Sequence, residues 1–262
     1  MGQFNIFLVL KVVLLYSCLL YLVVGVYLFI FQKKYIYFPL PQDFYDCPNF
    51  ANSQKLNLNS TRVYYKKNSD KLVVFYHGNA GSACDRVFMK NKFESLNYSY
   101  IFVEYTGYAN DSPKPSKKIL MQDVRNVNDF IKNLGYQKLV LAGESLGASL
   151  ALYHSSLIDE DKVLLISPFY KLSDVAKVHY SWYPVSWMLL DNYDNSEWVD
   201  NVNNLLIVHG ENDEIIPIEH SRKLFDKANA VQKNFVALKN TGHNDMFLDQ
   251  ESFNPIADFL KN

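Results

Sequence analysis

The chain of 262 residues is long enough for one sizeable domain and a short appendage, and its net charge is −1. This charge balance excludes the basic surface of a nucleic-acid-binding protein, so we expect no nucleic acid partner. Cys18, Cys47 and Cys84 are too few for a disulfide framework, and no CxxC pair indicates a metal or redox site. We therefore expect a fold held by its hydrophobic core, with no cofactor and no metal.

The first predicted element is a helix over residues 12–31 that is long and apolar enough to cross a bilayer. This segment carries no charge, and its helix would span roughly 30 Å, the thickness of a hydrocarbon core. Lys33 and Lys34 follow it, together with aromatic residues that suit the headgroup region. We predict a single-pass membrane anchor over residues 1–34.

This apolar segment has two other interpretations. A buried core helix would usually be amphipathic, whereas this segment is apolar on all sides. A cleaved signal peptide would have a shorter apolar region and a small-residue cleavage site. Neither pattern occurs here. Because Lys11 flanks one end and Lys33 and Lys34 flank the other, the side of the membrane that holds the rest of the chain is left open.

Residues 35–60 are interpreted as a connector, because several prolines interrupt any regular period. The remainder, residues 61–262, alternates between strand-like and helix-like segments. Strands are predicted at 61–65, 71–77, 100–105, 138–143, 162–167, 204–210 and 234–239, and helices near 85–96, 116–134, 146–157, 218–229 and 250–261. Continuous aliphatic strands separated by helices are typical of an α/β fold with a mostly parallel sheet and helices on both faces.

The strongest chemical motif is GESLG at residues 143–147, between a predicted strand and a predicted helix. In that setting G-x-S-x-G is a nucleophile elbow, a sharp turn that presents the Ser145 hydroxyl at the edge of the sheet. Side chains at positions 143 and 147 would collide with the neighbouring strand and helix. An ordinary glycine-rich turn would have the same sequence, so the assignment depends on finding partners for Ser145.

A serine hydroxyl needs a base to take its proton and an acid to orient that base. In this type of site the chain order is Ser, then Asp or Glu, then His, each after a strand. Asp213 follows the next-to-last predicted strand, and His243 lies in the loop after the last one. Asp213, like Glu211 and Glu214, could instead be a turn residue, and His243 a surface histidine. We assign Ser145, Asp213 and His243 as nucleophile, acid and base.

The loop HGNAGS at residues 77–82 is expected to supply part of an oxyanion hole. Acyl transfer needs two N–H donors aimed at the oxygen that becomes negative. We assign them to the backbone of Leu146, which follows the nucleophile, and of Asn79. His77 and His209 each end a strand before a glycine, and we expect them to shape the loops.

These segments together resemble the membrane-anchored α/β hydrolases that include the ABHD-type protein depalmitoylases and their bacterial relatives, often labelled serine aminopeptidase-like. The shared motifs are FQKKYIYFP (31–39), HGNAGS (77–82), GESLGAS (143–149), SPF (167–169), HGENDEIIP (209–217) and GHND (242–245). The resemblance implies an α/β-hydrolase fold with a small cap inserted at about 170–200, and the same roles for Ser145, Asp213 and His243. At 105–112 the chain lacks the arginine and second glycine of the family's usual Y-R-G-Y-G-x-S, which bears on the shape of that loop.

The expected cap is rich in large apolar residues, including Trp182, Trp187 and Trp198. An apolar cap on a membrane-tethered enzyme suggests an acyl chain in the substrate, although the same residues could simply pack the cap onto the core. We expect hydrolysis of carboxylic ester or thioester bonds in lipid-like small molecules or acylated proteins, through an acyl-serine intermediate. Membrane lipid is the other expected partner, and no obligatory protein partner is evident.

Two alternatives to this activity stay open. A serine aminopeptidase would use the same three residues, but the cap contains no clear acidic pair to bind a substrate amine. A catalytically silent, membrane-bound interaction module is the other alternative, and the complete set of Ser145, Asp213 and His243 argues against it.

Overall fold

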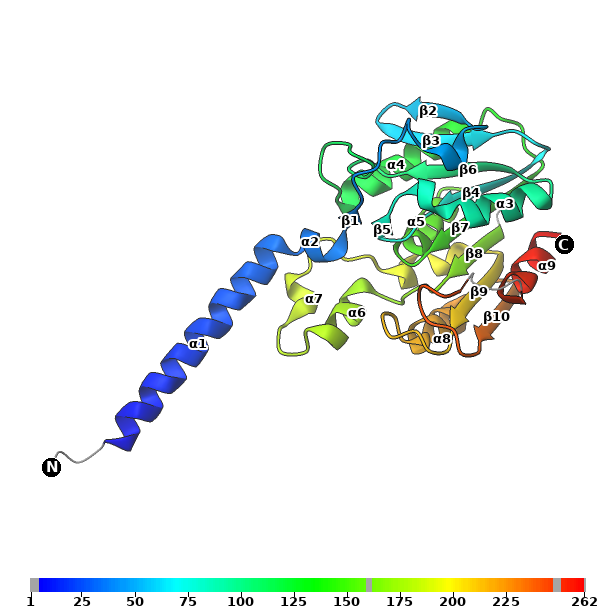
Figure 1. Ribbon diagram of the computed structural model, residues 1–262. Coiled ribbons are helices and arrows are strands. Elements are labelled where there is room, and N and C mark those ends of the chain that lie inside the picture. The colour runs from blue at the N-terminus through cyan, green and yellow to red at the C-terminus, as the bar shows by residue number, and fades with distance from the viewer. Residues whose placement is uncertain (1–4, 159–161, 247–250, 262) are drawn as a thin grey trace.

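An eight-stranded sheet forms the centre of the computed structural model, which describes residues 5–158, 162–246 and 251–261 (Figure 1). The strand order is β10-β9-β8-β7-β4-β6-β3-β2. The strands are β2 Gln54–Leu58, β3 Thr61–Lys66, β4 Lys71–Tyr76, β6 Ser99–Glu104, β7 Lys138–Glu144, β8 Lys162–Ile166, β9 Asn204–Gly210 and β10 Gln232–Leu238. The pairs β2–β3 and β3–β6 are antiparallel and the others are parallel. The predicted mostly parallel sheet is confirmed.

Helices cover both faces of the sheet because successive side chains of each strand point to opposite sides. In β4, Val74 belongs to a core cluster with residues of α4, α5 and α8, whereas Phe75 belongs to a second cluster with residues of α3 and α9. These helices are α3 Val87–Ser95, α4 Lys117–Ile131, α5 Leu146–Ser155, α8 Ile218–Lys227 and α9 Asn254–Lys261. The central strands are therefore buried on both faces, as their continuous apolar sequences predict.

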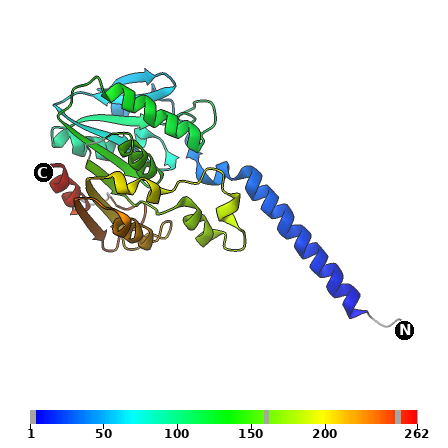
Figure 2. The same ribbon diagram turned by 180° about the vertical axis from the view of Figure 1, so that it is seen from behind.

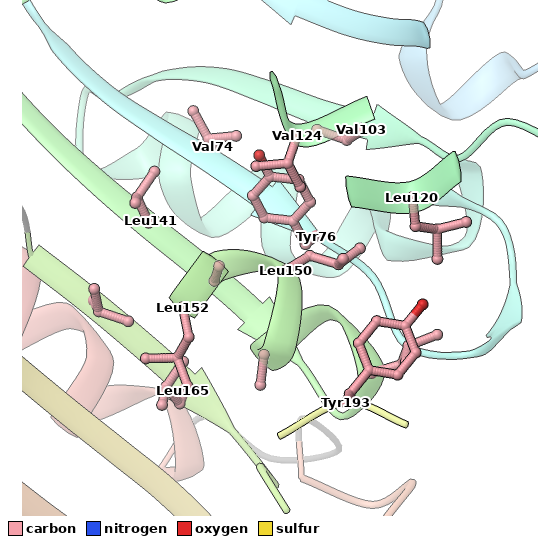
Figure 3. Packing of buried hydrophobic residues seen from close by; sticks show 14 of the residues in the cluster. Val74, Tyr76, Val103, Leu120, Val124, Leu141, Leu150, Leu152, Leu165 and Tyr193 are labelled. Carbon is pink, nitrogen blue, oxygen red and sulfur yellow. The ribbon is translucent and has the colours of Figure 1, made fainter. Parts of the chain in front are cut away.

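The cluster under α4 and α5 holds β7 in place (Figure 3). Leu120, Val124 and Val127 recur at helical spacing along α4, and all three are fully buried. Leu141 of β7 and Leu150 of α5 pack in the same cluster. Each such side chain stabilises the fold by roughly 1.5–3 kcal/mol, so the junction between β7 and α5 is firmly anchored.

A disulfide corrects the expectation that the core alone holds this fold. Cys47 and Cys84 are bonded, with their Cα atoms 5.9 Å apart. Cys47 precedes the short helix η1 (Pro48–Phe50) and Cys84 lies in η2 (Ala83–Arg86). Their separation of 37 residues gives no sequence signal, because only the folded chain brings η1 next to η2. Cys18 is an exposed free cysteine.

The N-terminal helix α1 (Ile6–Phe31) projects away from the domain (Figure 1). It begins six residues earlier than the predicted helix at 12–31, because Lys11 does not interrupt it and Asn5 caps it by accepting from the N–H of Leu8. Its length, about 39 Å, and its composition are sufficient to cross a membrane. No residue of α1 is buried.

The short helix α2 (Lys33–Ile36) and strand β1 (Phe38–Pro39) connect α1 to the domain, where β1 pairs with β5 (Ala80–Gly81). The segment between β8 and β9 forms α6 (Leu172–His179), α7 (Val185–Met188), η3 (Asn195–Glu197) and η4 (Val199–Asn201). In both views α6 and α7 lie on the side of the domain where α1 joins it (Figures 1 and 2). We call α6, α7 and the residues between them the cap.

Candidate active site

Ser145 occupies the sharp turn between β7 and α5 with a φ of 53°. Such a backbone conformation is costly for a residue other than glycine and persists only when its surroundings enforce it. A Cβ at Gly147 would lie 2.1 Å from the Tyr76 carbonyl oxygen, and one at Gly143 would lie 2.2 Å from the Gly147 carbonyl oxygen. The two glycines therefore allow α5 to begin directly against β4 and β7.

A partly buried ion pair fixes the elbow from the side. Arg86 donates from Nε and Nη2 to the two carboxylate oxygens of Glu144, both at 2.9 Å. Burial alone would raise the pKa of Glu144, but the Arg86 guanidinium offsets this and the pKa is lowered. Arg86 also donates to the Ala80 carbonyl oxygen. One arginine thus ties Glu144, the residue before Ser145, to the 77–82 loop, a contact that the sequence did not reveal.

Asp213 and His243 are in direct contact, although they lie 30 residues apart. His243 Nδ1 donates to Asp213 Oδ2 at 2.6 Å. The other carboxylate oxygen accepts from the backbone N–H groups of Ile215 and Ile216, at 2.9 and 2.8 Å. Burial would raise the pKa of Asp213, but the imidazoles of His209 and His243 and the Ile216 N–H lower it strongly. The carboxylate is therefore ionised at neutral pH and suited to orient an imidazole.

His209 has a second role besides shaping its loop. Its Nε2 lies 3.1 Å from Asp213 Oδ2 and is hydrogen-bonded to the Ile216 carbonyl oxygen at 2.9 Å. Its Nδ1 is hydrogen-bonded to Ser221 Oγ. Both ring nitrogens are thus held, and the fully buried ring forms a wall behind Asp213. The sequence signal that could have found it is its position in HGENDEIIP, four residues before the aspartate.

The loop that carries His243 folds back toward the elbow. Ser145 donates its backbone N–H to Ile166 at the end of β8, and the next residue, Ser167, donates its hydroxyl to Met246 Sδ at 3.2 Å. The loop after β10 therefore reaches the strand adjacent to β7. Within the described part of the chain, no hydrogen bond joins Ser145 to His243; such catalytic contacts often form only when substrate is bound.

The two assigned N–H donors border one cavity. Asn79, Ser145 and Leu146 all line it. The first N–H groups of a helix such as α5 have no acceptor within the helix, and the Asn79 N–H donates to no acceptor among the described residues. Both groups are thus free to bind an oxygen atom.

Two tyrosines hold the 77–82 loop in position. Tyr105 donates its hydroxyl to the His77 carbonyl oxygen at 2.6 Å, and Tyr108 donates to that of Asn79 at 2.8 Å. The Tyr105 ring also stacks on His77, with ring centroids 4.0 Å apart. Between them stands Thr106, which hydrogen-bonds to Asp123. The departure from the Y-R-G-Y-G pattern thus leaves both supporting tyrosines in place.

The cavity has a volume of about 280 Å³ and a predominantly apolar lining. Phe169, Leu172 and Val175 line it together with Ile215 and Ile216. Among the described residues that line it there is no Asp or Glu. This volume is near the lower end of ordinary small-molecule pockets, roughly 300–1,000 Å³. The described residues contain no group of three or more His, Cys, Asp or Glu that could hold a metal ion.

Comparisons with known proteins agree with this architecture. Residues 50–174 match a family model described as an alpha/beta hydrolase of unknown function, DUF1057. An uncharacterised protein of Mycobacterium tuberculosis is 31% identical over 181 residues, which are 68% of this chain and 64% of that protein. The lysophosphatidylserine lipase ABHD12 of Bos taurus is 30% identical over 182 residues, 61% of this chain and 46% of that protein. The matches thus span less than two thirds of these relatives' length.

Solved structures share the fold at low sequence identity. An esterase of Pyrococcus furiosus superposes with a TM-score of 0.66 at 14% identity, covering 80% of this chain and 90% of the esterase. The alpha/beta hydrolase domain-containing protein 10 from mouse gives a TM-score of 0.59 at 17% identity, covering 80% of this chain and 97% of that one. These superpositions confirm the predicted fold class.

Proposed function

This chain belongs to the α/β-hydrolase family, and we propose that it is a serine hydrolase that cleaves ester or thioester bonds of lipid-like or acylated substrates. The observation that carries the proposal is a strained Ser145 that borders an apolar cavity, together with a hydrogen-bonded pair of Asp213 and His243. The lipase activity named for the ABHD12 relatives supports it.

The proposed reaction begins when His243 Nε2 takes the proton of the Ser145 hydroxyl as Oγ attacks the carbonyl carbon. The carbonyl oxygen becomes negative and is held by the N–H groups of Asn79 and Leu146. Each such donor accounts for a factor of about 10²–10³ in rate. The proton then passes from His243 to the leaving alcohol or thiol, and an acyl-Ser145 ester remains. Water, deprotonated by His243, releases the acid and restores the serine.

Asp213 stabilises the imidazolium that forms at His243 in both steps. Its lowered pKa keeps it ionised, so it acts by charge and orientation and takes no proton itself. The two backbone donors to its other oxygen hold the carboxylate plane fixed. His209 prevents the carboxylate from turning away.

The composition of the cavity favours an acyl substrate over an aminoacyl one. An aminopeptidase must compensate the ammonium group of its substrate, because a buried unpaired charge is costly. No described residue of the cavity lining is acidic. Asp191 and Asp194 lie near the cap but are engaged elsewhere, Asp191 with Tyr37 and Asp194 with Lys171. The aminopeptidase alternative therefore lacks support at this site.

We also propose that α1 is retained as a single-pass anchor, because the domain itself binds its C-terminal end. Gln32, directly after α1, is buried and donates to the Met188 carbonyl oxygen while accepting from the Leu190 N–H. A cleaved leader would not be expected to complete the hydrogen bonds of the mature domain.

The test compares two serine-to-alanine variants of the full chain in detergent micelles. Ser145→Ala should lower hydrolysis of a medium-chain p-nitrophenyl ester by about 10⁶-fold and abolish labelling by a fluorophosphonate. Ser149→Ala is the matched control, since Ser149 lies one turn further along α5 with a buried hydroxyl that has no partner within the described structure. Hydrolysis that persists in Ser145→Ala at the level of Ser149→Ala would contradict the proposal.

A further inference from the structure

One face of α1 is docked onto the cap. Tyr21, Gly25, Leu28 and Gln32 follow each other at intervals of four, three and four residues, so they form a single stripe along the helix. Gly25 and Leu28 are half-buried, whereas their neighbours Val24 and Val26 are exposed. Since the rest of α1 is almost entirely exposed, this stripe is the surface by which the helix contacts the domain.

The N-terminal part of the stripe, Tyr21 and Gly25, contacts two cap residues. Tyr21 stacks on Tyr183, with ring centroids 4.6 Å apart and planes 11° apart. The Tyr21 hydroxyl donates to the Trp182 carbonyl oxygen at 2.7 Å, and the Tyr183 hydroxyl donates to the Tyr21 carbonyl oxygen at 3.1 Å. A Cβ at Gly25 would lie 3.0 Å from the Tyr183 ring. The glycine thus provides the space in which the Tyr183 ring lies against the helix.

The C-terminal part of the stripe borders the cavity that is also lined by Ser145. Leu28 and Phe29 of α1, Gln32 after it, and Tyr35 and Ile36 of α2 line this cavity. Residues of α6 and α7 also line it. The space in front of Ser145 is therefore lined both by residues of the hydrolase domain and by residues of α1 and α2.

The cap also presents large apolar side chains to the outside. Trp182 is 85% exposed and Trp187 is 92% exposed. Tyr21, which binds Trp182, lies 11 residues before Gln32, or about 16 Å along the helix axis. α1 is about 9 Å longer than a hydrocarbon core of roughly 30 Å. Whichever end of α1 is aligned with the bilayer edge, Tyr21 remains within the apolar layer, and the Trp182 backbone lies beside it.

We propose that the C-terminal end of α1 forms one wall of the acyl-binding site. A bilayer lipid then passes its acyl chain from the leaflet to Ser145 between α1 and the cap. The occupant is a lipid chain because the lining is apolar, the helix is of membrane-spanning length, and the cap exposes the large apolar side chains of Trp182 and Trp187. This inference rests on the proposed function.

The decisive experiment uses the wild-type chain in phosphatidylcholine vesicles. The probe is a fluorophosphonate with a medium-length alkyl chain that ends in a diazirine. It should attach to Ser145 and, after irradiation, cross-link to the peptide covering residues 27–38. Failure to attach at Ser145 would refute the proposed function. Attachment at Ser145 with cross-links confined to residues of α5 or α8 would refute only the role of α1.

A matched pair of variants supplies a second measurement. In Leu28→Trp the larger ring occupies part of the cavity that Leu28 lines. In Ile30→Trp the same ring lies on the opposite, exposed face of α1. Leu28→Trp should lower kcat/KM for p-nitrophenyl laurate relative to the acetate by about tenfold or more, because overpacking excludes the long chain. Ile30→Trp should leave that ratio at the wild-type value. An unchanged ratio in a Leu28→Trp protein that still labels at Ser145 would overturn the inference.

Discussion

Removing the Cys47–Cys84 disulfide should destabilise the hydrolase domain strongly. The bond closes a loop of 37 residues, and the chain-entropy relation gives about 4 kcal/mol for a loop of that length. Alanine is the better replacement, because both cysteines are buried in a hydrophobic cluster and burying a serine hydroxyl there is costly. The double variant Cys47→Ala, Cys84→Ala should therefore unfold at a clearly lower urea concentration than the wild type.

The assay is urea unfolding of the full chain in a mild detergent, followed by tryptophan fluorescence. The unfolding free energy of a domain of this size falls by about 3 kcal/mol per molar urea. The expected loss of stability therefore lowers the urea concentration at which half the protein is unfolded by about 1 M. Adding a reductant should shift the wild type in the same direction and leave the double variant unchanged. Cys18→Ala is the matched control and should unfold like the wild type, since Cys18 is exposed and unbonded.

Thiol titration of the denatured, unreduced protein checks the premise independently. One free thiol per chain is expected before reduction and three afterwards, because only Cys18 is unbonded. Three thiols before reduction, or equal midpoints for wild type and double variant, would refute the reasoning.

Two further predictions concern buried carboxylates, and a third concerns the side of the membrane on which the domain lies. Asp213→Asn should lower kcat by about 10⁴-fold with little change in KM, measured on a p-nitrophenyl ester, because the amide holds His243 in the wrong tautomer; an unchanged kcat would argue against this role. Burial raises the pKa of Asp123 from 3.8 to about 6, because the buried site disfavours the ionised carboxylate. The free energy of unfolding should therefore be about 3 kcal/mol higher below pH 3.8, where this carboxyl is protonated, and that stabilisation should be lost as the pH rises through 6. The difference in unfolding free energy between wild type and Asp123→Asn should therefore change between pH 4 and pH 7, and a constant difference would contradict it. Finally, because disulfides persist in oxidising compartments, the domain should lie on the oxidising side of the membrane; protease added to that side of sealed vesicles should digest it, and protection would exclude this orientation.

The parts of the fold that could be predicted are those encoded in short stretches of sequence. The strands around β7 are continuous aliphatic segments, and the elbow needs its two glycines within five residues. The loops with Asp213 and His243 could be located because each follows a strand that can be recognised by itself. Their contact then follows from the parallel sheet, which brings the carboxyl ends of neighbouring strands to one edge.

The features that escaped prediction depend on contacts between distant segments. β2 is short and lies at the edge of the sheet beside β3, so its sequence shows little of the burial that marks a central strand. Arg86 is an ordinary helix residue until the fold brings it to Glu144. Gln32 looks like the polar end of an anchor, and only the folded chain brings it to the Met188 and Leu190 backbone groups that it binds.

The docking of α1 bears on how such a protein should be prepared. Membrane anchors are commonly removed to obtain a domain that crystallises, on the assumption that the helix serves only as a tether. Here a chain shortened to begin near Phe38 would lack Leu28, Phe29 and Gln32 from the cavity lining. It would also expose the cap surface that Tyr21 covers. Substrate preferences measured on the shortened domain would therefore describe an opened site, and the intact chain should be used for that purpose.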